Sequence, residues 1–157
     1  MKKRDCGPCI ACCEGWLNSK IMNLSPGNPC PDCTEQGYGI YETRPEDPCR
    51  SFICGWLQED SPLPDNMRPD LSGAIVRFER KWRGNQTITA IPVGAKIPQE
   101  TLDWLMAYAR EQQIPLIFLE NFVKEGRFSG WKKTGYGPPA FVEEVKTSIN
   151  INDIVRL

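Results

Sequence analysis

The sequence predicts an α+β fold in which a cysteine-rich N-terminal half packs on a small antiparallel sheet with one or two helices. Two observations support this class. Residues 1–70 are rich in proline, glycine and cysteine and show little hydrophobic periodicity. From residue 71 onward, the periodicities typical of strands and helices begin. A chain of 157 residues fits a single domain spanning residues 1–157, with its cysteine-cluster segment at 1–70 and an α+β segment at 71–157.

The N-terminal segment needs a source of order other than its own core. Nine prolines between positions 8 and 69 forbid long helices there. Short helices are still expected at residues 9–16 and 49–58. A segment of this composition buries little apolar surface, and cross-linking by metal is one way in which such units become ordered.

The elements of the second half follow in order. Residues 74–80 and 86–91 have strand patterns, and Arg83-Gly84-Asn85 between them predicts a β-hairpin. Pro98 opens a helical pattern that should end near Gln113, because Pro115 disfavours helix at the residue before it.

The C-terminal part is predicted by weaker patterns. Residues 116–119 are a short buried strand, and residues 126–139 are rich in turn residues and are expected to form a loop. A second helix is expected over residues 140–147, with Glu143 and Glu144 on its solvated face. The tail at 149–157 is compatible with a strand or with disorder.

The eight cysteines dominate the question of function. They form the runs C-x-x-C-x-x-C-C, C-x-x-C and C-x4-C, at Cys6, Cys9, Cys12, Cys13, Cys30, Cys33, Cys49 and Cys54. Thiols at this density indicate metal ligation, disulfides or redox chemistry. No apolar leader follows the basic first four residues, so a cytoplasmic, reducing location is expected and disulfides are disfavoured. Metal ligation is the favoured interpretation.

Zinc and an iron–sulfur cluster both fit these thiols. Cys6, Cys9 and Cys12 have the C-x2-C-x2-C spacing that grips three corners of a [4Fe–4S] cube, while Cys13 points elsewhere. The zinc alternative pairs Cys6 and Cys9 with a later pair such as Cys30 and Cys33, and eight ligands also suffice for two sites. The tripod spacing favours iron slightly over zinc, and the partition of the cysteines stays open.

Three sequence stretches resemble a known family. They are C-G-P-C-I-A-C-C at 6–13, P-C-P-D-C at 29–33 and I-Y-E-T-R-P-E-D-P-C-R-S-F-I-C-G-W-L at 40–57, with a looser likeness in M-R-P-D-L-S-G-A at 67–74. Together they resemble the CxxCxxCC cysteine-cluster family, small bacterial proteins described as zinc- or iron-chelating. The resemblance implies that all eight cysteines are candidate ligands.

One departure from that family concerns Tyr38. Family members commonly carry a further cysteine at this position, so the resemblance implies one thiol fewer here, or a weak phenol donor in its place. Arg44 and Arg50 are candidate counter-charges for the thiolates, because four thiolates around a divalent zinc leave a net charge of about −2. Pairing of Arg44 with a nearby glutamate is an equal alternative.

The sequence also excludes several functions. A chain without histidine cannot form a Ser-His-Asp or Cys-His arrangement, and the glycine-rich phosphate-binding motifs do not occur. A net charge of −1 gives no general attraction to nucleic acid, and no apolar run is long enough for a membrane span.

The favoured function is therefore metal binding through cysteine thiolates, in a structural, carrier or assembly role and not as a catalyst. Two alternatives stay open. One is an iron–sulfur-dependent redox or protein-modification enzyme, and the other is a zinc-stapled module that binds a protein partner.

Overall fold

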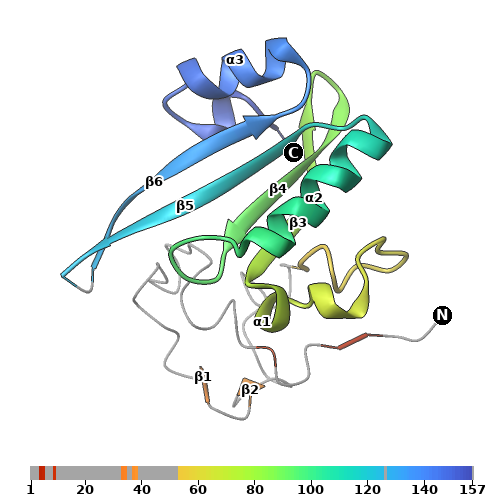
Figure 1. The fold of residues 1–157 in the computed structure, drawn as a ribbon, viewed down its shortest axis with the longest axis vertical. Coiled ribbons are helices and arrows are strands. Elements are labelled where there is room, and N and C mark those ends of the chain that lie inside the picture. The colour runs from red at the N-terminus through yellow and green to blue at the C-terminus, as the bar shows by residue number, and fades with distance from the viewer. Residues whose placement is uncertain are drawn as a thin grey trace.

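The computed structural model describes residues 4–5, 9, 53–125 and 127–156, and the backbone of two short strands, β1 (Cys33–Thr34) and β2 (Gly37–Tyr38). A four-stranded sheet forms the centre of the described part, with strand order β3-β4-β5-β6 (Figure 1). Its strands and the three helices of the described part are β3 (Ala74–Trp82), β4 (Asn85–Pro92), β5 (Leu116–Lys124), β6 (Arg127–Tyr136), α1 (Pro69–Ser72), α2 (Gln99–Gln112) and α3 (Pro139–Thr147).

This architecture confirms the α+β class, but the sheet is mixed where an antiparallel one was expected. The β3–β4 and β5–β6 pairs are antiparallel, whereas β4 and β5 run parallel. The reason is α2, which carries the chain back along the sheet before β5 begins, as in other β-helix-β crossovers. One or two helices were predicted, and the additional α1 is a single turn.

The predicted hairpin and first long helix are both confirmed. Arg83 and Gly84 have φ values of 48° and 81°, the left-handed pair that a two-residue turn between twisted strands requires. Helix α2 buries Leu105 and Ala109 on one face. It ends at Gln113, which has φ of 55° and donates its N–H to the last turn of the helix.

The expectation of a loop at residues 126–139 is wrong, because most of this stretch is β6. Pairing with β5 extends from Leu116–Tyr136 to Lys124–Arg127. Two glycines serve the strand and do not mark a turn. Gly130 has φ of 149° next to a break in the register, and Gly135 lies where Val145 of α3 approaches the sheet.

The two long helices pack on opposite faces of the sheet. Successive strand residues point to opposite faces, and Leu116 and Ile117 belong to different core clusters. The larger cluster joins Leu116 to α2 and to residues 54–67, whereas the smaller one joins Ile117 to α3 and the C-terminal residues. Residues 54–67 therefore lie on the same side of the sheet as α2.

The C-terminal tail is ordered against the edge strand β3. A 3₁₀ turn at Ile151–Asp153 (η5) precedes Ile154 and Val155, which are both buried. Lys81 and Arg156 then exchange backbone hydrogen bonds of 2.7 and 2.9 Å. The tail thereby covers part of an edge that would otherwise expose unpaired backbone groups.

Of the two other helices predicted at the start of the chain, the one at residues 9–16 falls outside the described residues except for Cys9. The one at 49–58 is described from Ile53, and that part forms turns and no helix. Across the described ranges, no helix combines the length and apolar character needed to cross a membrane.

We predict that Gly135→Ala destabilises the fold by about 1–3 kcal/mol, because overpacking forces backbone shifts. A Cβ at this position would lie 2.8 Å from Val145 Cγ2 and 2.9 Å from Val145 Cβ. Val145→Ala removes Cγ2, the nearest atom, and so relieves part of the clash. The double variant should therefore be more stable than the sum of the two single losses predicts. Denaturant unfolding measures all three variants, and strictly additive losses would contradict the close contact.

Glu144 was expected on a solvated helix face, but it holds the β3–β4 turn. Its carboxylate accepts hydrogen bonds from the Trp82 indole at 2.8 Å and the Arg83 guanidinium at 2.5 Å. These bonds, that from Trp82 first, lower the pKa of Glu144. Because the folded-state pKa lies below the unfolded one, the carboxylate stabilises the fold above the unfolded pKa, and this contribution disappears as pH falls through the folded pKa.

Accordingly, wild type should be more stable than Glu144→Gln at pH 7, since glutamine keeps an acceptor oxygen but carries no charge. The difference should stay constant down to about pH 5 and shrink once the pH falls below the ordinary glutamate pKa of about 4.3. Chemical unfolding of both proteins across this range measures it. An equal difference at pH 7 and pH 3 would show that the charge of Glu144 is irrelevant.

Candidate metal centre

Arg4 anchors the start of the chain beside the first cysteine run. Its guanidinium donates hydrogen bonds of 2.8 Å to the carbonyl oxygens of Trp56 and Leu63 and lies 3.1 Å from Asp65. It also stacks 4.6 Å from the centroid of the Trp56 ring. These contacts fix Arg4 against residues 56–65.

Cys54 begins the segment that receives this anchor. The next residue, Gly55, donates its N–H to the carbonyl of Val76 on β3. A Cβ on Gly55 would lie 2.8 Å from that same oxygen, so only glycine permits this approach. The Cys54 carbonyl accepts from the N–H groups of Leu57 and Gln58, and its side chain packs against the larger core cluster.

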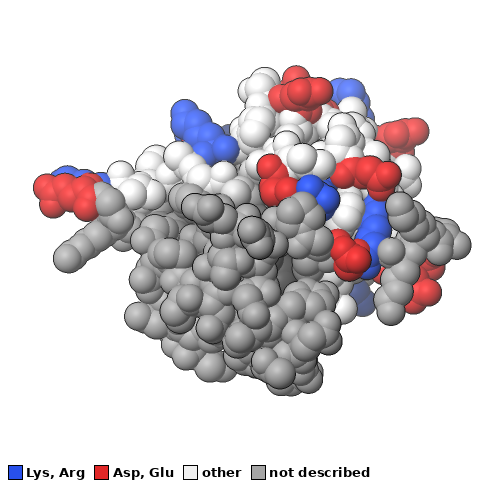
Figure 2. All heavy atoms as spheres, turned by 90° about the horizontal axis from the view of Figure 1, so that it is seen from below, with Lys and Arg blue, Asp and Glu red and all other residues white. Residues whose placement is uncertain are grey.

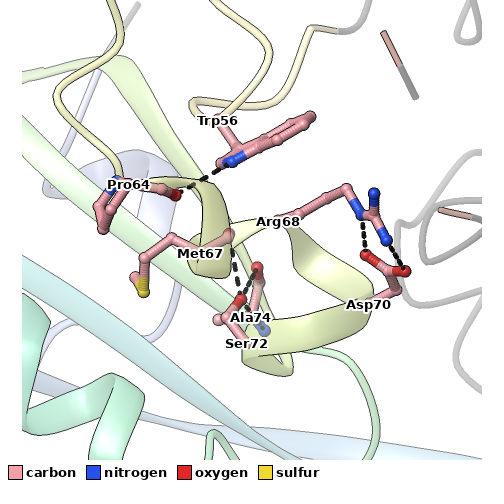
Figure 3. Close-up of polar contacts among 7 residues, drawn as sticks. All are labelled: Trp56, Pro64, Met67, Arg68, Asp70, Ser72 and Ala74. Carbon is pink, nitrogen blue, oxygen red and sulfur yellow. Dashed lines mark hydrogen bonds and ion pairs between the residues drawn. The ribbon is translucent and has the colours of Figure 1, made fainter. Parts of the chain in front are cut away.

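We call residues 54–72 the platform; this segment runs from Cys54 to the end of α1. Trp56, Leu63 and Met67 bury their side chains in the core beneath it. The Trp56 indole donates to the Pro64 carbonyl at 3.1 Å, which closes the loop ahead of a 3₁₀ turn at Asp65–Met67 (η4) (Figure 3). Apolar burial and backbone bonds therefore fix the platform to the sheet.

Helix α1 ends the platform and is held at both of its ends. Pro69 occupies the first helical position, where a backbone N–H would have no partner within the helix, so its absence costs no hydrogen bond. At the other end, Gly73 has φ of 76°, and a Cβ there would lie 2.7 Å from Pro98. The Thr101 hydroxyl donates to the Ser72 carbonyl at 2.6 Å, so α2 also holds α1 in place.

Arg68 and Asp70 form a two-pronged ion pair at the start of α1. Arg68 Nε donates to Asp70 Oδ1 at 2.5 Å, and Nη2 donates to Oδ2 at 2.8 Å (Figure 3). The two side chains are only 22% and 26% exposed. Their hydrogen bond raises the pKa of Arg68 and lowers that of Asp70, so both groups stay charged.

Cys9 acts electrostatically on this ion pair. After the bond between Arg68 and Asp70 itself, it contributes to the lowered pKa of Asp70 and to the raised pKa of Arg68. Cys54, the other predicted ligand whose side chain the structure describes, is the first residue of the platform. Both cysteines are partly buried.

The other predicted ligands are placed less completely. Cys33 lies in β1 and pairs with Tyr38 of β2, so the position where the resembled family has another cysteine lies directly opposite Cys33. The rest lie outside the described residues, as do Arg44 and Arg50; they are Cys6, Cys12, Cys13, Cys30 and Cys49. Within the described ranges, no group of three or more Cys, Asp or Glu side chains is placed to hold a metal ion.

Sequence reasoning assigned no role to Arg4, Arg68 or Asp70. A signal for the last two was present, because both lie in the M-R-P-D-L-S-G-A stretch that resembles the family. Arg4 had no such signal, since a basic residue at a chain start is commonplace. Cys9 contributes to the raised pKa of Arg68, after the bond to Asp70, whereas the predicted counter-charges Arg44 and Arg50 lie outside the described residues.

Charged side chains of both signs mix over the described part of the face seen in Figure 2. Several are neutralised in pairs, among them Arg4 with Asp65 and Lys96 with Glu120. Known proteins offer no further guide, since the chain matches no family model, no curated protein and no solved structure.

We predict that Arg4→Gln lowers the free energy of unfolding by about 1–3 kcal/mol, because two partly buried carbonyl oxygens lose a charged donor. Arg4→Lys keeps the charge but cannot reach both carbonyls with one planar group, so its loss should be smaller. Denaturant unfolding monitored by tryptophan fluorescence compares the three proteins. Equal stability of Arg4→Gln and wild type would show that this anchor carries no energy.

Proposed function

We propose that this protein binds a thiophilic metal through its clustered cysteine thiolates, and that its role is non-catalytic or accessory. The observation that carries the proposal is the density and spacing of the eight thiols in a chain without histidine. Thiolates in such number suit zinc or an iron–sulfur cluster better than hard cations such as magnesium or calcium.

The donor set fits such a metal. The chain has eight thiols and no histidine, so a closed site would use thiolates almost alone. The eight candidate ligands remain those that the sequence predicts. A bound zinc ion would supply cross-linking of the N-terminal segment, and an iron–sulfur cluster would supply an electron-transfer group as well.

The resemblance to the CxxCxxCC family supports the same proposal. It covers residues 6–57 and, more loosely, 67–74, which is the stretch that holds Arg68 and Asp70. The spacing of Cys6, Cys9 and Cys12 favours iron slightly, as a tripod for a [4Fe–4S] cluster. The cytoplasm, where thiols stay reduced, is the compartment that suits this chemistry.

Anaerobic purification followed by elemental analysis tests the proposal. Wild type should contain stoichiometric zinc or iron, and visible absorption with bound sulfide would identify a cluster. Cys9→Ser and Cys54→Ser should each lower the metal content, because a hydroxyl is a poor replacement for a thiolate. Gly135→Ala is the control, since it destabilises the contact between β6 and α3, removes no thiol and should keep its metal.

Tyr38→Cys adds a gain-of-ligand variant, with Tyr38→Phe as its matched partner. A cysteine at position 38 would stand opposite Cys33 in the β1–β2 pair, so it should raise metal retention against a competing chelator, whereas phenylalanine should not. Wild type that holds neither zinc nor iron after anaerobic reconstitution would refute the proposed function.

A further inference from the structure

We propose that a cavity at one end of the sheet, lined by Arg110, Gln113 and Tyr136, binds a small monocarboxylate with an apolar body. The cavity lies between the last turn of α2 and the turn that joins β6 to α3, and its volume is about 400 Å³. No cysteine is among the described residues that line it. The inference therefore goes beyond the proposed metal binding and does not depend on it.

Two turns of unusual backbone conformation form the cavity. Gln113 ends α2 with φ of 55°, and the chain then enters β5, whose Leu116 pairs with Tyr136 of β6 (Figure 1). Gly137 follows with φ of 143°, which side-chain-bearing residues rarely adopt, and a Cβ there would lie 3.2 Å from Pro115 Cα. The end of α2 and the start of α3 therefore meet at the same end of the sheet.

The walls of the cavity are mostly apolar. Ile114, Pro138 and Val142 supply aliphatic surface, and Gly135 and Gly137 have no side chains to fill the space beside them. Ligand sites in proteins usually have volumes of about 300–1,000 Å³ and combine apolar walls with a few polar groups. The cavity has this composition, because only three of its described lining residues have polar side chains.

Arg110 is the only charged side chain among the described residues that line the cavity. Within the described part of the chain it forms no ion pair, whereas Arg4, Arg68 and Arg83 each hold a carboxylate. A guanidinium presents its N–H donors in a planar fork that fits the two oxygens of a carboxylate. A carboxylate ligand would therefore meet a cation for which no described acidic residue competes.

A single cation in an apolar cavity favours a ligand with a single negative charge. One guanidinium balances a monocarboxylate, whereas a phosphate dianion would keep an unpaired charge against apolar walls, which is costly. Tyr136 supplies a further donor, because its side chain is half-buried and its hydroxyl makes no hydrogen bond within the described residues. The apolar walls would then cover the body of the ligand.

The experiment titrates the reduced, full-length protein with phenylacetate and follows its backbone amide signals by NMR. Phenylacetate joins one carboxylate to an apolar ring, phenylacetamide has the same shape without the charge, and phenyl phosphate is a dianion. Phenylacetate should shift amide signals of residues 109–114 and 135–142. Its affinity should exceed that of either comparison compound about 10-fold, because a hydrogen bond between a guanidinium and a carboxylate is stronger than a neutral one.

Four variants test the roles of the lining residues. Arg110→Gln should weaken phenylacetate binding about 10- to 100-fold and leave phenylacetamide binding unchanged, and Tyr136→Phe should weaken phenylacetate binding about 2- to 10-fold. Val142→Phe enlarges a side chain that lines the cavity and should weaken the binding of both compounds. Lys146→Gln is the matched control for Arg110→Gln, because Lys146 also lies in the last turn of a helix but does not line the cavity.

The results that would overturn the inference are specific. If Arg110 only complements the dipole at the end of α2, Arg110→Gln and Lys146→Gln lose stability alike and phenylacetate affinity does not change. Absence of phenylacetate binding to wild type, equal affinity for phenylacetamide, or amide shifts confined to other residues would also overturn it. Circular dichroism establishes that each variant is folded. Metal content is measured separately, so either proposal can fail while the other stands.

Discussion

The backbone hydrogen bond from Gly55 to Val76 is the constraint on which the candidate site depends. It fastens the residue after Cys54 to β3, and it requires a side chain no larger than hydrogen, because the carbonyl and the Phe78 ring both lie within 2.9 Å of where a Cβ would be. The platform continues from this contact. Trp56 enters the core next, and its carbonyl is one of the two that Arg4 binds.

The sequence predicts those elements whose residues by themselves favour the structure that they form. The Arg83-Gly84 pair predicts the β3–β4 hairpin. Apolar residues at helical spacing, with Pro115 beyond them, predict α2 and its end. Strand β6 could not be predicted in this way. Its glycines and serine are typical of loops, and only the pairing with β5 and the approach of Val145 to Gly135 make them suitable for a strand.

The candidate site shows the same division. Cysteine spacing predicts Cys9 and Cys54 as ligands, because thiols this closely spaced have few roles other than metal binding, disulfide formation or redox chemistry. Spacing says nothing about what holds them in place. Cys54 packs against the larger core cluster, and the next residue, Gly55, is bonded to Val76 of β3. Arg68 and Asp70 are ordinary surface residue types, and they become notable only when their two hydrogen bonds and their partial burial are seen together.

Two kinds of contact hold the described residues. Residues 74–156 supply most of both core clusters through apolar burial across a four-stranded sheet, and Trp56, Leu63 and Met67 of the platform add to the larger cluster. Arg4, by contrast, is held by polar contacts with Trp56, Leu63 and Asp65. Individually such contacts are weak, because each replaces a bond to water. All eight cysteines lie in the proline-rich first part of the chain, and a metal bound there by thiolates, as we propose, would add cross-links to a segment whose composition offers little apolar surface to bury.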